Sequence, residues 1–265
     1  MDDKDILLAR VRELSYRASS NGYLTHTGFL SLSEQNVFFS FLRESHIDPN
    51  RREYQGSRFL LYGGNDEADR KMIFFLPYYL SDEAFLSQES CQIITCLKIS
   101  PKNEKFADHL THRDYLGALM KLGYEREMYG DILTDGTTGY VFLSASIASY
   151  VKDELTKVRH TVVDGTLIPC RECQFRPQFR ELTLHLASER IDCVIAEVFH
   201  LSRRGSQELI GKECVFVDGM TMMDNSFHLK PESRVSIRGY GKFIYHGNPN
   251  LTKKGRYVAK ADLYA

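Results

Sequence analysis

The order of strand-like and helix-like segments in the middle of the chain constrains its fold more than any single motif. Alternating apolar residues predict strands, and apolar residues three and four positions apart predict helices. The predicted strands cover residues 58–62, 71–76, 91–99 and 140–143, and the predicted helices cover 111–122 and 146–158. Strands and helices mixed in this way predict an α+β fold, with helices layered on a sheet.

Two more helices are predicted before these strands, over residues 3–18 and 33–44. The polar stretch 46–55 contains a proline and predicts a linker. We therefore expect three parts: a helical N-terminal segment, a central α+β domain and a C-terminal domain. Their expected boundaries are residues 1–50, 51–178 and 179–265.

The C-terminal part is predicted to begin with two short helices, over residues 188–200 and 202–210. The first has apolar side chains at i, i+3, i+4 and i+7, namely Ile191, Val194, Ile195 and Val198. Short strands are expected at 215–217 and 234–238. The tail from 248 to 265 is basic and interrupted by Gly and Pro, and the pattern leaves open whether it is ordered.

Charge is distributed unevenly along the chain. The 265 residues carry a net charge of −1, which argues against a nucleic-acid partner for the chain as a whole. Residues 201–260, however, contain 11 Lys and Arg against 5 Asp and Glu, a net charge of +6, so the rest of the chain carries −7. This asymmetry is typical of a protein with one RNA-facing domain, and a solvated basic face explains it equally well.

Arginine side chains gather at the two helix starts of the C-terminal part. Arg190 and Asp192 lie on the first helix, and the second opens with Ser202 as N-cap, Arg203 and Arg204. A helix N-terminus offers unpaired N–H groups and a partial positive charge, and arginine binds phosphate oxygens with a planar fork. These residues predict a phosphate-binding face. Three further cations are expected to extend it: Lys212, Arg238 and Lys242.

Two other motifs invite functional interpretations. The sequence His112-Arg113-Asp114 resembles a kinase catalytic loop, but Leu119 stands where that loop needs Asn, so we interpret Asp114 as part of a helix N-terminus and Arg113 as an RNA contact. Cys170 and Cys173 have the spacing of half a zinc site, and no second such pair exists. We therefore predict no catalytic residue, no metal and no cofactor.

The aromatic run Phe74, Phe75, Tyr78 and Tyr79 has two interpretations. Its side chains could stack unpaired bases on a sheet, as in single-strand RNA modules, or form hydrophobic core. We favour the core, because both faces of so apolar a strand tend to be buried.

Several blocks of the sequence resemble a known family. The runs ASERIDCVIAEVFHLSRRGSQELI, CVFVDG and VSIRGYGKF resemble the αL RNA-binding motif, a module shared by a ribosomal protein, pseudouridine synthases and tyrosyl-tRNA synthetases. The runs FLLYGG, NDEADRKMIFFLPYYL, HRDYLGALMKLGYERE and GDIL resemble the bacterial YlmH family. The resemblance extends from the N-terminal helices to about His246.

This resemblance implies more than the residues do by themselves. It implies a central domain like an RNA-recognition fold and a C-terminal αL module that contacts ribosomal RNA and tRNA. It also implies a role at the large ribosomal subunit carrying stalled peptidyl-tRNA, in ribosome-associated quality control, with a link to cell division. The residues that match the motif are Arg190, Asp192, Ser202, Arg203, Arg204, Arg238, Gly239, Gly241 and Lys242.

The chain departs from the family pattern at a few positions. Glu213 and Asp218 stand where Gly and Asn are usual, and Ser233-Arg234 replaces Gly-Asp. Asp218 can still form a turn, but an acidic residue at these positions is expected to weaken RNA contact locally.

The sequence thus predicts a non-catalytic, RNA-binding protein that takes no small-molecule substrate. No apolar run is long enough to span a membrane, and the acidic N-terminus is followed by no apolar stretch, so we expect a cytoplasmic protein with reduced cysteines. Two alternatives remain: an RNA-modifying enzyme of pseudouridine-synthase type that uses the αL module for delivery, and a division-linked protein whose partner is another protein.

Overall fold

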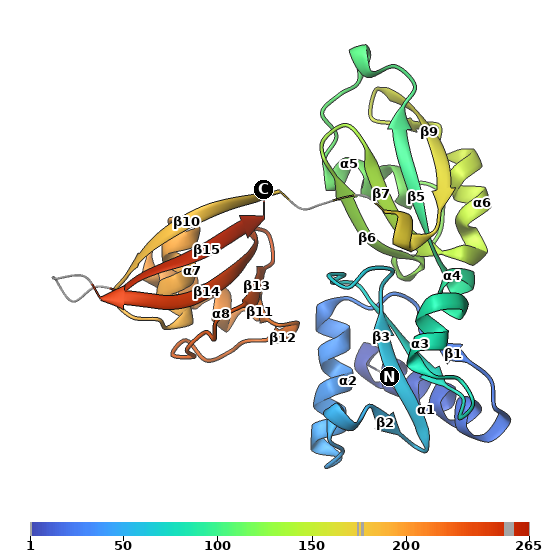
Figure 1. The fold of residues 1–265 in the computed structure, drawn as a ribbon, viewed down its shortest axis with the longest axis horizontal. Coiled ribbons are helices and arrows are strands. Elements are labelled where there is room, and N and C mark those ends of the chain that lie inside the picture. Colours follow the sequence, from blue (N-terminus) through green and yellow to red (C-terminus); the bar gives the residue numbers. More distant parts are fainter. Residues whose placement is uncertain (1, 174, 176–177, 252–256, 265) are drawn as a thin grey trace. The chain divides into compact units, whose positions relative to one another are not determined.

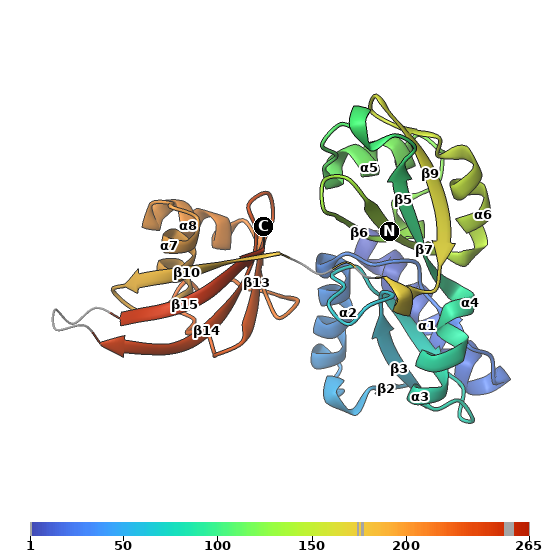
Figure 2. The same ribbon diagram turned by 45° about the horizontal axis from the view of Figure 1, so that its top comes forward.

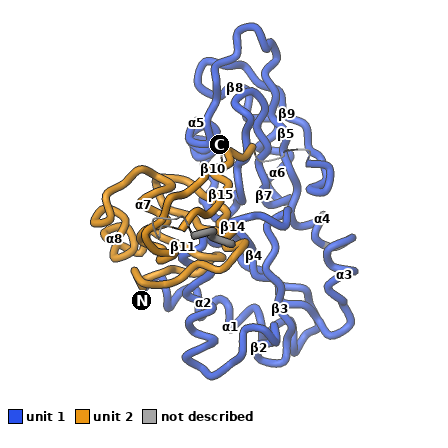
Figure 3. Tube along the Cα trace, turned by 60° about the vertical axis from the view of Figure 1, so that its left-hand side comes forward, with its two compact units in different colours: residues 1–175 blue, residues 176–265 orange. Residues whose placement is uncertain are grey.

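The chain forms two compact units, residues 1–175 and 176–265, which Figure 3 shows in different colours. The computed structural model describes residues 2–173, 175, 178–251 and 257–264. Both units combine helices with antiparallel sheets, so the predicted α+β class is confirmed.

The first unit begins with an N-terminal lobe, defined here as residues 3–76. Helices α1 (Asp3–Asn21) and α2 (Leu32–Glu44) cover one face of a four-stranded sheet. The strand order is β1 (Thr25–His26), β4 (Met72–Leu76), β3 (Ser57–Tyr62) and β2 (Glu53–Tyr54). The segment that we expected to be helical therefore also supplies strand β1, which pairs with β4.

Helix α2 begins one residue earlier than predicted, because its capping residues differ from those expected. Ser31 accepts a hydrogen bond from the N–H of Glu34 at 3.4 Å, and the Glu34 carboxylate accepts the Ser31 N–H at 2.6 Å. This reciprocal capping box starts the helix at Leu32 rather than at Ser33.

The central domain follows a short helical connection made of α3 (Asp82–Ala84), η2 (Phe85–Glu89) and α4 (Ser90–Ile93). Its elements are β5 (Ile94–Pro101), α5 (His112–Met120), β6 (Tyr129–Thr134), β7 (Gly139–Ser144), α6 (Ala145–Glu154), β8 (Lys157–Val158) and β9 (Thr161–Ile168). The antiparallel strand order is β6-β7-β5-β9-β8. A β-α-β-β-α-β chain with β7 and β5 in the centre is the split βαβ topology, and both helices cover one face (Figure 1).

The other face of the central sheet packs on the N-terminal lobe. Phe142 on β7 and Cys96 on β5 lie in one buried cluster with Phe29, Met72 and Phe74. A Cβ on Gly64, whose φ is +98°, would overlap the Phe142 ring, so this approach requires glycine. Strand β4 is thus buried on both faces, one against α1 and α2 and the other against the central domain.

Backbone contacts also hold the lobe on the central domain. The Asp131 carboxylate accepts the N–H groups of Asp69 at 2.7 Å and Arg70 at 3.1 Å. The Arg70 guanidinium donates in turn to the carbonyls of Tyr129 at 3.0 Å and Phe29 at 2.6 Å. The bonds to Asp131 and Tyr129 fix the two parts of the first unit together, and the bond to Phe29 within the lobe helps to satisfy the half-buried arginine.

The second unit is a six-stranded antiparallel sheet with two helices on one face (Figure 2). The strand order is β10 (Phe179–Leu186), β15 (Tyr257–Tyr264), β14 (Gly241–Leu251), β13 (Ser233–Ile237), β11 (Val215–Val217) and β12 (Met220–Thr221). The helices are α7 (Ile191–Val198) and α8 (Arg203–Gly211). All four apolar residues predicted for the first helix are buried under the sheet.

The C-terminal tail contains a strand that the sequence pattern did not reveal. Residues 257–264 form β15, which pairs with β10 along its whole length and with β14 on its other side. Residues 252–256 and 265 of the tail lie outside the described residues. The missed strand carries Lys260 and Asp262 among apolar residues, a mixture that suits a strand with one solvated face.

Candidate nucleic-acid interface

A buried carboxylate organises the start of both helices in the second unit. The Asp192 side chain has no exposed surface, and it accepts two hydrogen bonds from the Arg190 guanidinium, at 3.1 and 3.2 Å. It also accepts one from Arg203 Nε at 3.1 Å and one from the Gln207 amide at 2.8 Å. Burial opposes the charge of Asp192, but the bonds from Gln207, Arg203 and Arg190 outweigh it and lower the pKa of its carboxyl.

The guanidinium groups held by Asp192 remain in contact with solvent. The Arg203 side chain is 56% exposed and that of Arg190 is 31% exposed, although both form ion pairs with the same carboxylate. Arg204 is 89% exposed and pairs with Glu208 one turn along α8, at 3.1 Å. The three arginines therefore pair with carboxylates and yet keep contact with solvent, which Arg190 does least.

The N-terminus of α8 opens within this cluster. Ser202 is the N-cap, as predicted, and its Oγ accepts the N–H of Gly205 at 3.1 Å. The first-turn N–H groups and the partial positive charge of the helix end lie beside Arg203 and Arg204. Ser206 links the two helices, because its hydroxyl donates to the Asp192 carbonyl at 2.7 Å. We name the set Arg190, Asp192, Ser202, Arg203 and Arg204 the arginine cluster.

Two residues that support the arginine cluster escaped the sequence analysis. Gln207 and Ser206 lie one turn after Arg203 and Ser202 on α8, and both reach back to Asp192. Each lies four residues after a residue of the helix start, Ser206 after Ser202 and Gln207 after Arg203. This helical spacing is the sequence pattern that could have identified them.

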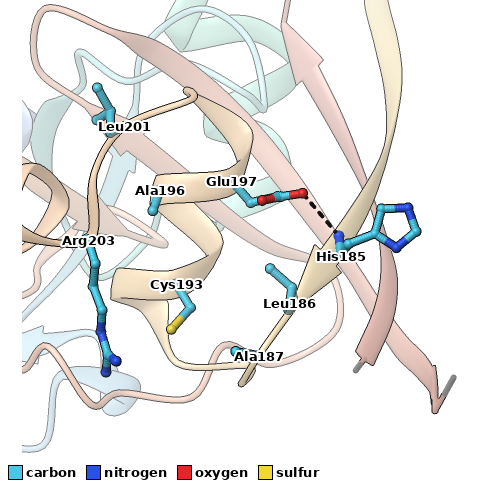
Figure 4. A pocket seen from close by; sticks show the side chains of 8 residues that line it. All are labelled: His185, Leu186, Ala187, Cys193, Ala196, Glu197, Leu201 and Arg203. Carbon is cyan, nitrogen blue, oxygen red and sulfur yellow. Dashed lines mark hydrogen bonds between the residues drawn. The ribbon is translucent and has the colours of Figure 1, made fainter. Parts of the chain in front are cut away.

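A small pocket of about 240 Å³ lies beside Arg203, between α7 and the end of β10. Its lining is His185, Leu186, Ala187, Cys193, Ala196, Glu197, Leu201 and Arg203 (Figure 4). Glu197 accepts the backbone N–H of His185 at 3.3 Å, and Figure 4 shows the His185 ring turned away from this contact. Burial raises the pKa of the Cys193 thiol, and the nearby Asp192 carboxylate adds to the shift, so this cysteine is not activated as a nucleophile.

The other predicted cations of the second unit have their printed contacts outside the arginine cluster. Lys212 follows the last residue of α8, about 13 Å along the helix from Arg203 at 1.5 Å per residue. Arg238 is near Lys212, since its N–H donates to the carbonyl of Cys214 at 2.9 Å, and its guanidinium lies 5.8 Å from the Phe216 ring centre. The Lys242 ammonium lies 5.7 Å from the ring centre of Tyr264, and Arg113 belongs to the first unit.

The positions that depart from the family pattern have unusual backbone conformations. Glu213 has φ +56° and Asp218 has φ +49°, in the left-handed region that favours Gly and Asn. Asp218 forms its turn, as predicted, and its carboxylate accepts the N–H of Arg234 at 2.8 Å. The family's Gly and Asn are thus explained by the backbone, and in this chain Glu213 occupies a conformation that costs free energy.

In the first unit, Asp114 acts as a helix cap, as we interpreted it. Its carboxylate accepts the N–H and the hydroxyl of Thr111, at 2.8 and 2.7 Å, and pairs with Arg159 at 3.6 Å. The bonds from Thr111 lower the pKa of Asp114. Arg113 is exposed on the first turn of α5.

The remaining candidates fall into core and surface. Phe74 and Phe75 are fully buried, as favoured, whereas Tyr78 is 91% and Tyr79 66% exposed. The Cys170 side chain is buried, and the described residues contain no group of three or more His, Cys, Asp or Glu arranged to hold a metal ion. None of the helices in the described ranges has the length and apolarity needed to cross a membrane.

The split βαβ domain lies within the region that matches a family model. Residues 90–172 match the family described as "Putative RNA-binding domain in YlmH". The match covers the central domain, and the resemblance to the YlmH family predicted from the sequence is confirmed.

Two similar proteins extend this comparison. The chain is 28% identical over 201 residues to "Ribosome-associated protein quality control protein P2" of Bacillus subtilis (strain 168), and the match covers 74% of each chain. It also resembles the solved "Cell division protein ylmH from Streptococcus pneumoniae", with 19% identity and a TM-score of 0.48, over 65% of this chain and 95% of the other. A likeness of that size carries no argument about function.

Proposed function

We propose that this chain is a non-catalytic RNA-binding protein that works on the ribosome and grips the backbone of structured RNA with the arginine cluster. Its partners would be ribosomal RNA and tRNA at the large subunit carrying stalled peptidyl-tRNA, in the cytoplasm. The name of the Bacillus subtilis relative, at 28% identity, supports the assignment to ribosome-associated quality control. We also propose that this function is linked to cell division.

One observation carries this proposal: a fully buried aspartate holds Arg203, which is 56% exposed, and Arg190, which is 31% exposed, beside the N-terminus of a helix. Orienting Arg190 and Arg203 before binding reduces the side-chain entropy lost when phosphate is bound. The bond from Asp192 uses Nε of Arg203, and the side chain beyond it is exposed for a phosphate. The arrangement suits recognition of backbone and shape rather than of base sequence.

The enzyme alternative finds less support in the structure. Asp114 of the His112-Arg113-Asp114 motif, the catalytic candidate that the sequence analysis weighed, is engaged by Thr111 and Arg159 as a helix cap. Mass analysis of ribosomal RNA and tRNA incubated with the protein distinguishes the two functions. A modified nucleotide would favour the enzyme, and unchanged RNA is the result expected.

The proposal is tested by the salt dependence of RNA binding. Each phosphate contact in duplex RNA adds about 0.9 to the slope of log affinity against log salt, by analogy with B-DNA. The double variant Arg203→Ala/Arg204→Ala is therefore expected to bind a ribosomal RNA stem-loop and tRNA more weakly, with a slope smaller by about 1.8. Fluorescence anisotropy at several KCl concentrations measures both quantities.

The chain offers a matched control for this double variant. Arg10 and Arg17 on α1 are about half exposed and both pair with Glu13, much as Arg204 pairs with Glu208. Arg10→Ala/Arg17→Ala removes the same charge and is expected to leave the slope unchanged. Equal slopes for the wild type and Arg203→Ala/Arg204→Ala would show that the arginine cluster does not bind RNA backbone.

A further inference from the structure

The central domain cannot present its sheet to RNA in the usual way. In RNA-recognition folds, aromatic side chains on the central strands stack two or three bases on the face opposite the helices. Here Tyr140 and Phe142 of the central strand β7 occupy that face, but Phe142 has no exposed surface and Tyr140 is 9% exposed. Phe29, Met72 and Phe74 of the N-terminal lobe cover the face instead.

At one end of the same domain, the β5–α5 connection lies beside the β8–β9 turn and the β6–β7 turn. The β5–α5 connection, residues 102–111, rises beyond the ends of β5 and β9 (Figure 1). It is tied to the β8–β9 turn, because the Asp108 N–H donates to Thr161 Oγ1 at 2.8 Å and the His160 N–H donates to the Asp108 carboxylate at 3.3 Å. It is tied to the β6–β7 turn by the Leu110 N–H, which donates to the Gly136 carbonyl at 2.8 Å. These bonds hold the connections in a defined surface.

Three of the carboxylates at this end are engaged within the protein, whereas its basic and imidazole side chains are exposed, although Arg159 also pairs with Asp114. Asp108 and Asp114 accept backbone N–H groups of other connections or of the helix cap, and Asp135 accepts those of its own turn, at 2.7 and 2.9 Å. Glu104 is the other acidic residue, and it is exposed. The exposed basic and imidazole side chains are Lys102, Lys105, His109, His112, Arg113, Arg159 and His160.

An exposed aromatic ring stands among these cations. Phe106 is 76% exposed, and the Lys105 ammonium lies 5.9 Å from its ring centre. A large apolar ring left in water beside cations is the combination that single-strand RNA surfaces use, because the ring stacks a base while the cations bind phosphates. The hydrophobic core of the domain does not use Phe106.

We propose that the loop end of the central domain, formed by residues 102–113 and the Arg159-His160 turn, is a second RNA-binding surface that takes single-stranded RNA. Phe106 stacks a base there, and Lys105 and Arg113 bind flanking phosphates. The inference rests on the proposed function, that the chain binds RNA, and it assigns to the YlmH-type domain a contact surface other than its sheet. Such a surface suits an unpaired segment, while the arginine cluster suits structured RNA.

The test uses the full chain and a short fluorescent oligouridylate as the single-stranded probe. Phe106→Ala is expected to weaken binding about five-fold or more, because stacking of one base is typically worth that much, and to leave the salt slope unchanged. Lys105→Ala/Arg113→Ala is expected to weaken binding and to lower the slope by about 1.4, at about 0.7 for each single-strand phosphate contact. Ultraviolet crosslinking of the oligouridylate is expected to label the peptide that contains Phe106.

Matched controls carry the same chemistry elsewhere on the first unit. Tyr16→Ala removes an aromatic side chain that is 63% exposed on α1, and Lys4→Ala/Lys121→Ala removes two exposed charges. All of these variants change surface residues, and unchanged thermal unfolding would confirm that they fold. The controls are expected to bind oligouridylate as the wild type does.

The outcomes separate this proposal from the function on which it rests. If oligouridylate binding is unchanged in Phe106→Ala and Lys105→Ala/Arg113→Ala, or crosslinks form only within residues 176–265, the loop end is not an RNA surface. The proposed function still stands in that case if Arg203→Ala/Arg204→Ala weakens binding of structured RNA. If neither pair of variants affects any RNA, both proposals fail.

Discussion

Replacing Asp192 tests the organisation of the arginine cluster most directly. Asp192→Ala removes the one carboxylate that receives bonds from Arg190, Arg203 and Gln207. It leaves two guanidinium groups without their shared partner and removes the bonds of Arg203 and Gln207 to the start of α7, while the Ser206 bond to the Asp192 carbonyl remains. We expect losses in both stability and RNA affinity, in amounts that follow from the burial of each group.

The size of the stability loss follows from the exposure of the partners. Breaking a fully buried ion pair costs about 3–5 kcal/mol, since the remaining charge is left in a dry site. Here the carboxylate is buried, but Arg190 and Arg203 are 31% and 56% exposed and can regain water. The expected loss is therefore smaller, about 2–3 kcal/mol in the free energy of unfolding of the second unit.

The expected loss of RNA affinity comes from the greater freedom of the two arginine side chains and not from a loss of positive charge. Both arginines remain in Asp192→Ala, but each must now be fixed when phosphate binds, at about 0.5–1.5 kcal/mol per long side chain. Two such side chains predict binding that is weaker by about 1–3 kcal/mol, or roughly five- to 160-fold. The salt slope is expected to stay close to that of the wild type, because no cation has been removed.

Urea unfolding followed by far-ultraviolet circular dichroism, with hydrogen exchange of the α7 and α8 amides, measures the stability loss. Its pH dependence adds a second check. The lowered pKa of Asp192 means that its contribution is present above the ordinary carboxyl pKa of about 3.9 and is lost as the pH falls through the lowered value. Asp192→Ala should lose this part of the acid destabilisation.

Glu208→Ala is the matched control, because it removes a carboxylate partner of Arg204 that is 53% exposed. It is expected to cost less than about 1 kcal/mol, as exposed pairs do. The reasoning would be refuted if Asp192→Ala unfolded at the same urea concentration as Glu208→Ala, or if it kept full RNA affinity while α8 lost its exchange protection.

Two further predictions concern the second unit. His246 forms ion pairs with Glu232 at 2.9 Å and with Asp262 at 3.0 Å, and these bonds raise its pKa. The stability that they add is therefore fully present below the ordinary histidine pKa of about 6.5 and is lost as the pH rises through the raised value. Urea unfolding at a series of pH values should show this loss in the wild type and not in His246→Gln. Glu213→Gly should raise the stability of the second unit by roughly 0.5–1 kcal/mol in the same assay. The left-handed conformation costs an L-residue about 1–2 kcal/mol, and the substitution removes this cost, but the greater entropy of glycine in the unfolded chain offsets part of the gain. Asp218→Gly should give no such gain, since it also removes the bond to the Arg234 N–H, and a gain there would contradict the explanation.

The arginine cluster was accessible from sequence because its parts are close along the chain. Residues 190–207 contain both helix starts, the N-cap and the central carboxylate, and helical spacing determines which side chains meet. Local patterns also predicted β11 at its observed bounds and the burial of Phe74 and Phe75. Lys212 and Arg238 were grouped with the cluster only by charge, and charge alone does not reveal distance along a helix.

Strand pairing across long separations was not accessible in the same way. Strand β15 pairs with β10, which lies about 80 residues earlier in the chain. The sequence pattern of each strand gives no indication that the other is its partner. The coverage of the central sheet was hidden for the same reason, because Phe142 and Phe29 meet only when the N-terminal lobe folds onto the central domain. An aromatic residue on a strand has the same sequence pattern whether it stacks a base or another side chain.

The sequence by itself determined the α+β class and the chemistry of the helix start at Arg203, since these depend on neighbours within one or two turns. It also predicted helices α1, α2, α5, α6, α7 and α8 and strands β3, β4, β5, β7, β11 and β13. Only the tertiary structure decided which residues remain exposed. It buried Phe142 under the N-terminal lobe and left Phe106 in solvent, although both are phenylalanines in the same domain. Exposure is a property of the packed surfaces around a residue, and those surfaces come from parts of the chain that no local pattern connects.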